Sequence, residues 1–274
     1  MAISTPDFDY VRTLARNSAA IVLDSDKQYL VETRLTPLAE KEGYPSLEAL
    51  IRALRAASSP GALHDRAVDA LTTNETLFFR DHHPFEALRQ TLLPRLIEAR
   101  APSMQLRIWC GACSTGQEPY SIAMLIRENF PLLAGWRVSI LATDISETVL
   151  ARARTGCYAQ HEVNRGLPAP LLIKYFRQSG NQWTLREDLR SMVTFQNLNL
   201  IGRWPPLPQF DLIFLRNVLI YFAAETKKQI LEKMMEKLAD PGYIALGSAE
   251  TPLILVPSLK AESIGRATFY TRKP

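Results

Sequence analysis

The chain has 274 residues, of which 47% are hydrophobic and 22% are charged, and its formal net charge is +4. This composition excludes a disordered or collagen-like chain, and the length fits one large domain or two smaller ones. No apolar run approaches the roughly 18 residues that a membrane span needs, and the N-terminal segment lacks the apolar core of a secretory signal. We therefore expect a cytoplasmic protein, and an odd number of cysteines, three, agrees with a reducing compartment.

Residues 1–75 predict a small all-helical domain. Apolar residues recur at three- and four-residue spacing over 11–23, 28–43 and 46–58, and a fourth helix is expected over 62–71. Asp26 and Ser46 are expected as N-caps, and Gly43 as a C-terminal stop.

From about residue 105 the pattern changes to buried strands that alternate with helices. Short apolar or β-branched runs lie at 105–110, 136–144, 210–217 and 242–250, with helical segments between them. This alternation predicts a parallel, doubly wound sheet covered on both faces. Residues 267–273 suggest a final strand. Residues 157–200 do not fit the alternation, because turn residues separate short strand-like pieces there, and we expect a small β insertion.

The segment after the first of these strands is the most informative. Small residues from Gly111 to Gly116 follow the strand, and a helix is expected to open near Pro119. Small residues let a ligand approach the backbone, and a helix N-terminus offers unpaired N–H groups. Asp144 ends the next strand, where an acid can accept hydrogen bonds from both hydroxyls of a ribose. The combination of a small-residue turn and an acid at the end of the next strand suggests an adenosine-containing cofactor. The alternative is a plain strand–turn–helix with a capping Asp144.

Two nucleotide-binding motifs are absent from this turn, and their absence reduces the number of candidate cofactors. The turn is neither G-x-G-x-x-G nor a phosphate-binding G-x-x-x-x-G-K-[ST] loop, so a dinucleotide or a nucleoside triphosphate loses support. S-adenosylmethionine has no phosphates to bind. It needs an acid for the ribose, an apolar slot for adenine and groups for a zwitterionic amino acid, and Glu118 could bind the ammonium.

Cys110 and Cys113 form a C-x-x-C pair at the same turn. The spacing permits a redox site, but the chain is far larger than a thioredoxin-type domain. A zinc site would need about two more ligands, and neither a second C-x-x-C nor a suitably spaced Cys/His pair is present. We expect no metal and interpret both cysteines as small buried hydrophobic residues.

Five stretches taken together resemble the chemotaxis receptor methyltransferases, the CheR family. They are residues 71–88, 107–124, 140–146, 193–200 and 211–222, and the most specific runs are N-E-T-L-F-F-R and L-R-N-V-L-I-Y-F. The resemblance implies an α/β fold with a Rossmann-like class I methyltransferase sheet, a small antiparallel β subdomain inserted in it, and an all-helical N-terminal domain before it. The expected parts are a helical domain at 1–75, a linker at 76–90 that contributes to the cofactor site, and a methyltransferase domain at 91–274 with the β subdomain at about 157–200.

The activity implied by the resemblance is transfer of a methyl group from S-adenosylmethionine to glutamate side chains of transmembrane chemoreceptors. The products would be glutamyl methyl esters and S-adenosylhomocysteine. The expected partners are the cytoplasmic domains of those receptors, with no nucleic acid, no membrane insertion and a monomeric enzyme. A short turn near Gly180 suggests independence from a pentapeptide tether at receptor C-termini. Two alternatives stay open: a nucleic-acid methyltransferase, and a non-catalytic S-adenosylmethionine-binding module that docks on receptors.

The resemblance also implies roles for individual residues. Arg80 and Tyr221 are expected at the methyl-transfer site, where Arg80 orients the acceptor carboxylate and Tyr221 positions Arg80 or the substrate. A glutamate is already ionised at pH 7 and needs no general base. Outside this context, Arg80 would be read as an ion-pair partner of Asp81 or a helix cap. The expected cofactor-binding residues are Asn74, Thr76, Arg80, Glu118, Asp144, Asn199, Leu200, Arg216 and Asn217.

The excess of basic residues lies in the C-terminal half of the chain. Within the expected insertion, residues 174–190 carry four basic side chains and only two acids, which makes this segment a candidate surface for the acidic helices of a receptor. Solvated helix faces are the alternative interpretation. The residues concerned are Lys174, Arg177, Arg186 and Arg190, against Glu187 and Asp188.

Overall fold

The computed structural model describes residues 3–273, which divide into two compact units. The smaller unit comprises Met1–Thr73 and Tyr221–Thr226, and the larger comprises Asn74–Ile220 and Lys227–Pro274. Among the described residues, no helix combines the length and the apolar character needed to cross a bilayer.

The smaller unit is built from helices, as predicted. Its elements are α1 (Thr5–Ala19), the 3-10 turn η1 (Ser25–Lys27), α2 (Gln28–Lys41), α3 (Leu47–Ala56) and α4 (Ala62–Leu71). Residues at helical spacing such as Val11, Leu35 and Leu50 are fully buried and form one apolar core. Burial of these faces is the main source of the unit's stability, because helices this short are marginal on their own.

The helix ends match the sequence only in part. Ser46 is the N-cap of α3, and its hydroxyl accepts a hydrogen bond from Ala49 N at 3.3 Å, as expected. Gly43 follows the end of α2 with φ +78°, which also agrees. The prediction for Asp26 was wrong: it lies inside η1, and the cap of α2 is Lys27, which makes no side-chain cap bond. The preceding 3-10 turn leads directly into α2, so the helix begins without a side-chain cap.

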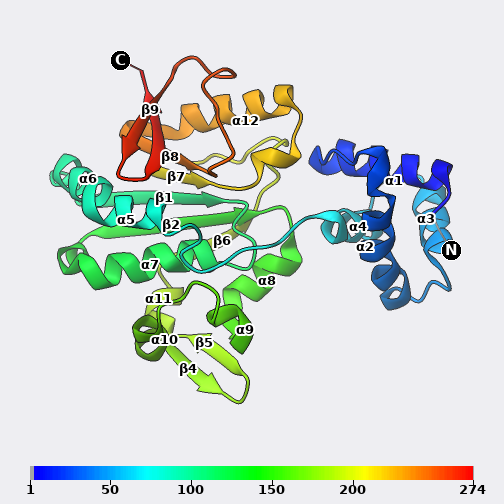
Figure 1. Cartoon of the computed structure of the whole chain (residues 1–274), viewed down its shortest axis with the longest axis horizontal. Helices are drawn as coiled ribbons and strands as arrows, with labels where there is room; N and C mark the ends of the chain where they lie inside the picture. The colour runs from blue at the N-terminus through cyan, green and yellow to red at the C-terminus, as the bar shows by residue number, and fades with distance from the viewer. Residues whose placement is uncertain (1–2, 274) are drawn as a thin grey trace. The chain divides into compact units, whose positions relative to one another are not determined.

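The larger unit is a mixed sheet with helices on both faces (Figure 1). Before the sheet come α5 (His83–Ala87), the π-helical turn η2 (Leu88–Leu92) and α6 (Leu93–Arg100). The first half of the sheet and its connections are β1 (Gln105–Gly111), α7 (Gln117–Asn129), η3 (Pro131–Gly135), β2 (Arg137–Asp144), α8 (Glu147–Thr155) and β6 (Val193–Asn197). The second half is β7 (Phe210–Leu215), η4 (Leu219–Tyr221), α12 (Ala224–Lys237), β8 (Leu238–Leu246), β9 (Leu259–Ile264) and β10 (Ala267–Arg272).

The seven strands lie in the order β6-β2-β1-β7-β8-β10-β9. The pairs from β6 through β8 are parallel, and β10 runs antiparallel to both of its neighbours. Every residue of β7 is buried, which explains why its sequence is a continuous apolar run. In Figure 1, α7 and α12 lie on opposite sides of this sheet. The carboxyl ends of β1, β2 and β7 therefore meet at one edge, where ligands bind in open α/β sheets.

The predicted β insertion is present between α8 and β6. It contains β3 (Cys157–Ala159), α9 (Gln160–Val163), α10 (Ala169–Tyr175), β4 (Phe176–Ser179), β5 (Gln182–Leu185) and α11 (Glu187–Arg190). Its strands form a separate antiparallel sheet in the order β3-β5-β4, and α11 contacts α7. The expected range of 157–200 extends too far, because β6 pairs in parallel with β2 at the edge of the large sheet. Only the first of the five residues of this edge strand is buried, so its sequence resembles those of the short strands in the insertion.

Candidate functional site

The turn after β1 is fixed to the end of β2. Ser114 N donates a hydrogen bond of 2.8 Å to one oxygen of Asp144, and Ser146 N donates one of 3.0 Å to the other oxygen. Helix α7 opens at Gln117, two residues earlier than expected, with Gly116 as its N-cap at φ +91°. Asp144 is buried at 6% exposure. These backbone bonds fix the orientation of the Asp144 carboxylate at the carboxyl end of β2.

Arg216 connects three separate segments at the same edge of the sheet. It follows β7, and its side chain is only 2% exposed. One terminal nitrogen donates to Glu118 of α7 at 2.8 Å, and the other donates to the Asp81 carboxylate at 2.6 Å and to the Arg80 carbonyl at 3.1 Å. A buried arginine that bonds two carboxylates is favourable only because its charge is matched locally. Arg216 therefore fixes the first turn of α7 against residues 80–81.

Glu118 lies in this cluster with a side chain only 12% exposed. Burial raises the pKa of the Glu118 carboxyl, and the nearby charge of Arg216 acts in the opposite direction. Glu118 thus shares the positive charge of Arg216 with Asp81. A ligand ammonium at this position would bind beside an ion pair rather than to an isolated carboxylate.

Arg80 takes neither of the two structural roles that its sequence neighbourhood alone permits. Asp81 pairs with Arg216 instead, and the hydrogen bond described for the half-buried Arg80 side chain runs to the Glu75 carbonyl at 3.2 Å. A guanidinium carries five N–H donors. Among the described residues, Arg80 therefore keeps most of its donors for another acceptor.

Backbone strain is concentrated around this cluster. Phe79, Asp81 and His82 have φ values of +48°, +68° and +46°, and Ala112 and Ser114 in the turn have +51° and +50°. A positive φ in a non-glycine residue costs about 1 kcal/mol or more and persists where the surrounding structure imposes it. Such strain is typical of functional sites, and here it falls in the two segments that Arg216 and Asp144 hold.

Glu250 is a site residue that the sequence reasoning missed. It is buried at 6% exposure just after β8, and it accepts hydrogen bonds from Gly247 N at 2.6 Å, Asn217 N at 3.0 Å and Ile220 N at 3.3 Å. Asn217 has φ +60°, and its Oδ1 atom is buried with no hydrogen-bond partner among the described residues. The available signal was an acid that follows a buried strand, the same signal that identified Asp144.

Replacing Glu250 with glutamine will lower the free energy of unfolding by about 2–3 kcal/mol. The amide keeps the volume of the side chain but replaces one acceptor with a donor, so at least one buried N–H loses its partner, at about 1–3 kcal/mol each. Chemical denaturation measures the change. A variant as stable as the wild type would show that these backbone bonds do not hold the segment after β7.

The structure places the remaining predicted residues at three positions: beside the turn after β1, after β6, and in the helical unit. Asn74 lies beside the turn, where its carbonyl accepts a 2.7 Å hydrogen bond from the Ser114 hydroxyl, and it lines a cavity of about 330 Å³ together with Thr76. Asn199 and Leu200 follow Leu198, whose N–H donates to the Asp144 carbonyl at 2.9 Å.

Tyr221 ends η4 and belongs to the helical unit, where its carbonyl accepts a hydrogen bond from Val22 N at 3.3 Å. Its role in methyl transfer stays a prediction.

The two cysteines of the turn are buried, free thiols. Burial raises the pKa of both Cys110 and Cys113 well above the usual value, so both stay protonated and unreactive. Across residues 3–273, no group of three or more His, Cys, Asp or Glu side chains is arranged to hold a metal ion. The burial of Cys110 and Cys113 and the raised pKa of both thiols support their interpretation as small buried hydrophobic residues.

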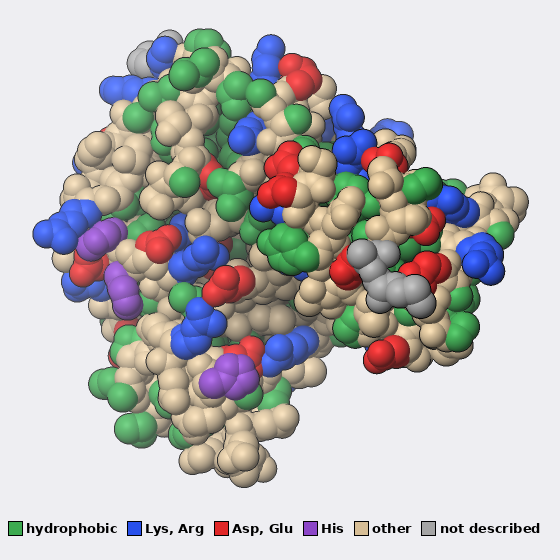
Figure 2. Space-filling model, turned by 45° about the vertical axis from the view of Figure 1, so that its right-hand side comes forward, with side chains coloured by type: hydrophobic (Ala, Val, Ile, Leu, Met, Phe, Trp, Pro, Cys, Tyr) green, Lys and Arg blue, Asp and Glu red, His purple; other side chains and the backbone are tan. Residues whose placement is uncertain are grey.

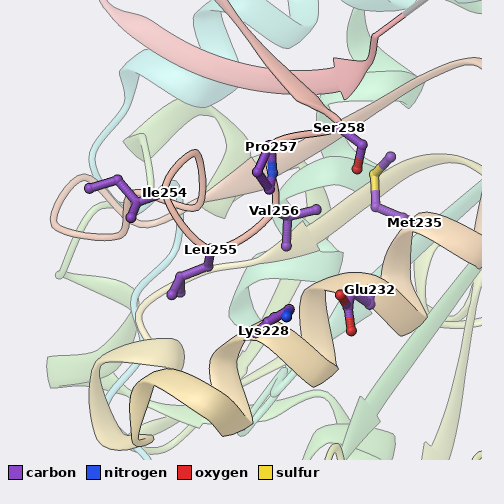
Figure 3. Close-up of a pocket in the computed structure, with 8 residues that line it drawn as sticks. All are labelled: Lys228, Glu232, Met235, Ile254, Leu255, Val256, Pro257 and Ser258. Carbon is purple, nitrogen blue, oxygen red and sulfur yellow. The ribbon is translucent and has the colours of Figure 1, made fainter.

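A larger cavity, of about 510 Å³, lies between α12 and the segment before β9 (Figure 3). Lys228 and Glu232 of α12 line one side, and the segment from Ile254 to Ser258 lines the other. None of the predicted site residues contributes to it. We therefore place the candidate site at the carboxyl edge of β1, β2 and β7 and not in this cavity.

The basic side chains of the insertion are mostly paired with acids. Lys174 binds Glu128 at 2.6 Å, Arg186 binds Asp188 at 3.1 Å, and Arg190 pairs with Glu187. On the face shown in Figure 2, basic and acidic side chains are likewise interspersed. The insertion thus offers less unpaired positive charge than its sequence suggests, which favours solvated surface over a receptor-binding patch.

The sheet with one reversed strand, the small-residue turn after β1 and the acid at the end of β2 define a Rossmann-like methyltransferase of class I. Two profiles match the chain: "CheR methyltransferase, SAM binding domain" over residues 74–258 and "CheR methyltransferase, all-alpha domain" over residues 6–72. The chain belongs to the CheR methyltransferase family, and its cofactor is S-adenosylmethionine.

Curated relatives align over nearly the whole chain. "Chemotaxis protein methyltransferase 1" of Pseudomonas aeruginosa is 44% identical over 256 residues, which cover 91% of this chain and 92% of the relative. "Chemotaxis protein methyltransferase Cher2" of Pseudomonas putida is 41% identical over 255 residues, with 91% and 92% covered. The all-helical N-terminal part and the cofactor-binding part are thus shared with these proteins.

Proposed function

We propose that this protein transfers a methyl group from S-adenosylmethionine to glutamate side chains in the cytoplasmic domains of chemoreceptors, forming glutamyl methyl esters. The observation that carries the proposal is Arg80. It is a half-buried guanidinium with one described hydrogen bond, next to a cluster in which the carboxylates of Asp81 and Glu118 are both bound by Arg216. Such a group suits an acceptor that arrives already carrying a negative charge.

The residues at the site fit the proposed cofactor. S-adenosylmethionine supplies a methyl group made electrophilic by a sulfonium. Asp144 would accept hydrogen bonds from the ribose hydroxyls, because its carboxylate is oriented by Ser114 N and Ser146 N. Glu118 would face the ammonium. The unpartnered Oδ1 of Asn217 is a buried acceptor that also requires a donor from outside the described residues.

The acceptor chemistry needs orientation more than proton transfer. A glutamate with an ordinary pKa of about 4.3 is ionised at pH 7. The acidic side chains next to Arg80, Glu118 and Asp81, are both bound by Arg216, so neither is presented as a general base. Arg80 would hold one carboxylate oxygen and direct the other toward the methyl group, and correct alignment of two reactants can supply about 7–11 kcal/mol.

The hairpin of the insertion supports a receptor interaction without a tether. Gly180 and Asn181 alone connect β4 to β5, with Gly180 at φ +57°. We propose that the protein acts as a monomer that recognises receptors without binding a C-terminal pentapeptide. Methylation of a receptor and of the same receptor lacking its last five residues should then proceed at the same rate.

A labelled-methyl assay tests the function. The protein is incubated with receptor-containing membranes and with S-adenosylmethionine labelled in the methyl group. We expect label on the receptor that alkali releases as volatile methanol, since this behaviour marks a carboxyl ester. Stable label on nucleic acid would instead identify a nucleic-acid methyltransferase. Cofactor binding without transfer to any receptor would identify a non-catalytic module.

A further inference from the structure

The β insertion contacts both walls of the cofactor site through one buried tyrosine. Tyr158 of β3 is 1% exposed, and its hydroxyl donates a 2.8 Å hydrogen bond to the carbonyl of Thr115 in the turn after β1. Its ring packs edge-on against Phe78, with centroids 5.0 Å apart and an angle of 75°. Burial raises the pKa of Tyr158 well above its usual value, so the hydroxyl remains a donor at all working pH values.

A second part of the insertion lies against the same backbone. Gly166 follows α9 with φ +84°, and a Cβ atom at this position would come within 2.1 Å of the Phe78 carbonyl oxygen. Phe176 of β4 also packs edge-on against Phe78, at 5.8 Å between centroids. Phe78 is thus enclosed by residues of the insertion, and its neighbours in the chain are positioned from that side.

The two contacted segments adjoin several of the predicted site residues. Thr115 follows Ser114, whose N–H binds Asp144 and whose hydroxyl binds the Asn74 carbonyl. Phe78 lies two residues before Arg80. Both segments contain residues at positive φ, Ser114 and Phe79, and such conformations relax unless contacts from outside the segment hold them.

We infer that Tyr158 is a positioning residue for the cofactor site: its hydroxyl holds the turn at Thr115, and its ring holds the Arg80 segment at Phe78. The insertion is then a structural support of the site in addition to any role at the surface. Tyr158 acts through these two segments. The inference rests on the cofactor-binding property of the family and does not depend on which acceptor is methylated.

A matched residue separates positioning from ordinary core stability. Tyr120 of α7 is also fully buried, and its hydroxyl donates a hydrogen bond to a backbone carbonyl, that of Ala153, at the same 2.8 Å. Ala153 lies in α8 and not in the turn after β1. Tyr158→Phe and Tyr120→Phe therefore remove the same group from equally buried surroundings, and only the hydroxyl of Tyr158 is bonded to the turn after β1.

The test compares both variants by thermal unfolding and by calorimetric titration with S-adenosylhomocysteine. We expect similar decreases in Tm, but a Kd raised at least fivefold for Tyr158→Phe and changed less than twofold for Tyr120→Phe. Hydrogen exchange should become faster at residues 111–116 in Tyr158→Phe alone, because the ring that packs on Phe78 is kept and only the bond to Thr115 is lost. In the methylation assay, KM for the cofactor should rise more than kcat falls. Equal effects of the two variants on Kd, or no effect of either, would overturn the inference.

Discussion

Replacing Arg80 with alanine will reduce methyl transfer by about 10²- to 10³-fold, the usual effect of removing one oriented donor from an active site. The guanidinium is proposed to align the acceptor carboxylate, and alanine leaves nothing to hold it. Cofactor affinity should fall much less, because Arg216 and Asp144, with their own hydrogen bonds, hold the remaining walls of the site. Initial rates with receptor membranes and calorimetric titration with S-adenosylhomocysteine measure the two effects separately.

Two further variants define the role of Arg80. Arg80→Lys keeps the charge without the planar donors, and we expect its activity to lie between those of alanine and the wild type. Arg95→Ala is the matched control, because Arg95 of α6 is an arginine 49% exposed that pairs with Glu262 of β9 and contacts none of the predicted site residues in the described interactions. A surface ion pair of this kind contributes little, so transfer should be unchanged. Near wild-type transfer by Arg80→Ala would remove this residue from the mechanism.

The sequence predicted the parts of the site that depend on local pattern. A buried run followed by small residues, and an acid at the end of the next strand, located the turn at 111–116 and Asp144. Strand ends in a parallel sheet meet at one edge, so this inference needs no knowledge of side-chain contacts. The same pattern, an acid that follows a buried strand, occurs at Glu250 after β8. It did not lead to a predicted site residue because residues 242–250 were interpreted only as a strand.

The contacts among distant residues could not be predicted in the same way. Arg216 lies 98 positions from Glu118 and 135 from Asp81, and nothing in either neighbourhood shows that one guanidinium binds both. The pairing is a product of topology, since β7 returns beside β1 only after the insertion has been completed. It also changes the chemistry expected of Glu118, from an isolated carboxylate to half of a buried ion pair.

The predicted C-terminal boundary of the insertion was also wrong because it depends on a contact between distant residues. Residues 193–197 alternate between apolar and polar side chains at the start, and in sequence only the short helix α11 separates them from the strands of the insertion. Their parallel pairing with β2, from Ile140–Val193 to Asp144–Asn197, is a long-range contact that only the assembled sheet reveals. This pairing brings Asn199 and Leu200 to the Asp144 edge, so the strand contributes to the site although it was expected to lie outside the large sheet.

Replacing Asp144 with alanine will raise the Kd for S-adenosylhomocysteine by about 10²-fold or more. Hydrogen bonds to a charged acceptor contribute about 1.5–3 kcal/mol each, and the two ribose hydroxyls would lose this acceptor together. The variant also leaves Ser114 N and Ser146 N without their partner, so the turn after β1 loses its side-chain bond to β2 and keeps the backbone bond from Cys113 N to the Thr143 carbonyl. Calorimetric titration gives the affinity, and thermal unfolding gives the accompanying loss of stability.

Asp211 provides the control for that loss of stability. It is a buried acid at 5% exposure whose carboxylate accepts a 2.7 Å hydrogen bond from Arg107 N and a 2.6 Å bond from the Arg100 side chain. It lies at the start of β7, at the opposite end of the strands from Asp144. Asp211→Ala should therefore destabilise the protein at least as much while leaving Kd unchanged. If both variants weaken cofactor binding equally, general loss of folding explains the effect, and Asp144 is not the ribose acceptor.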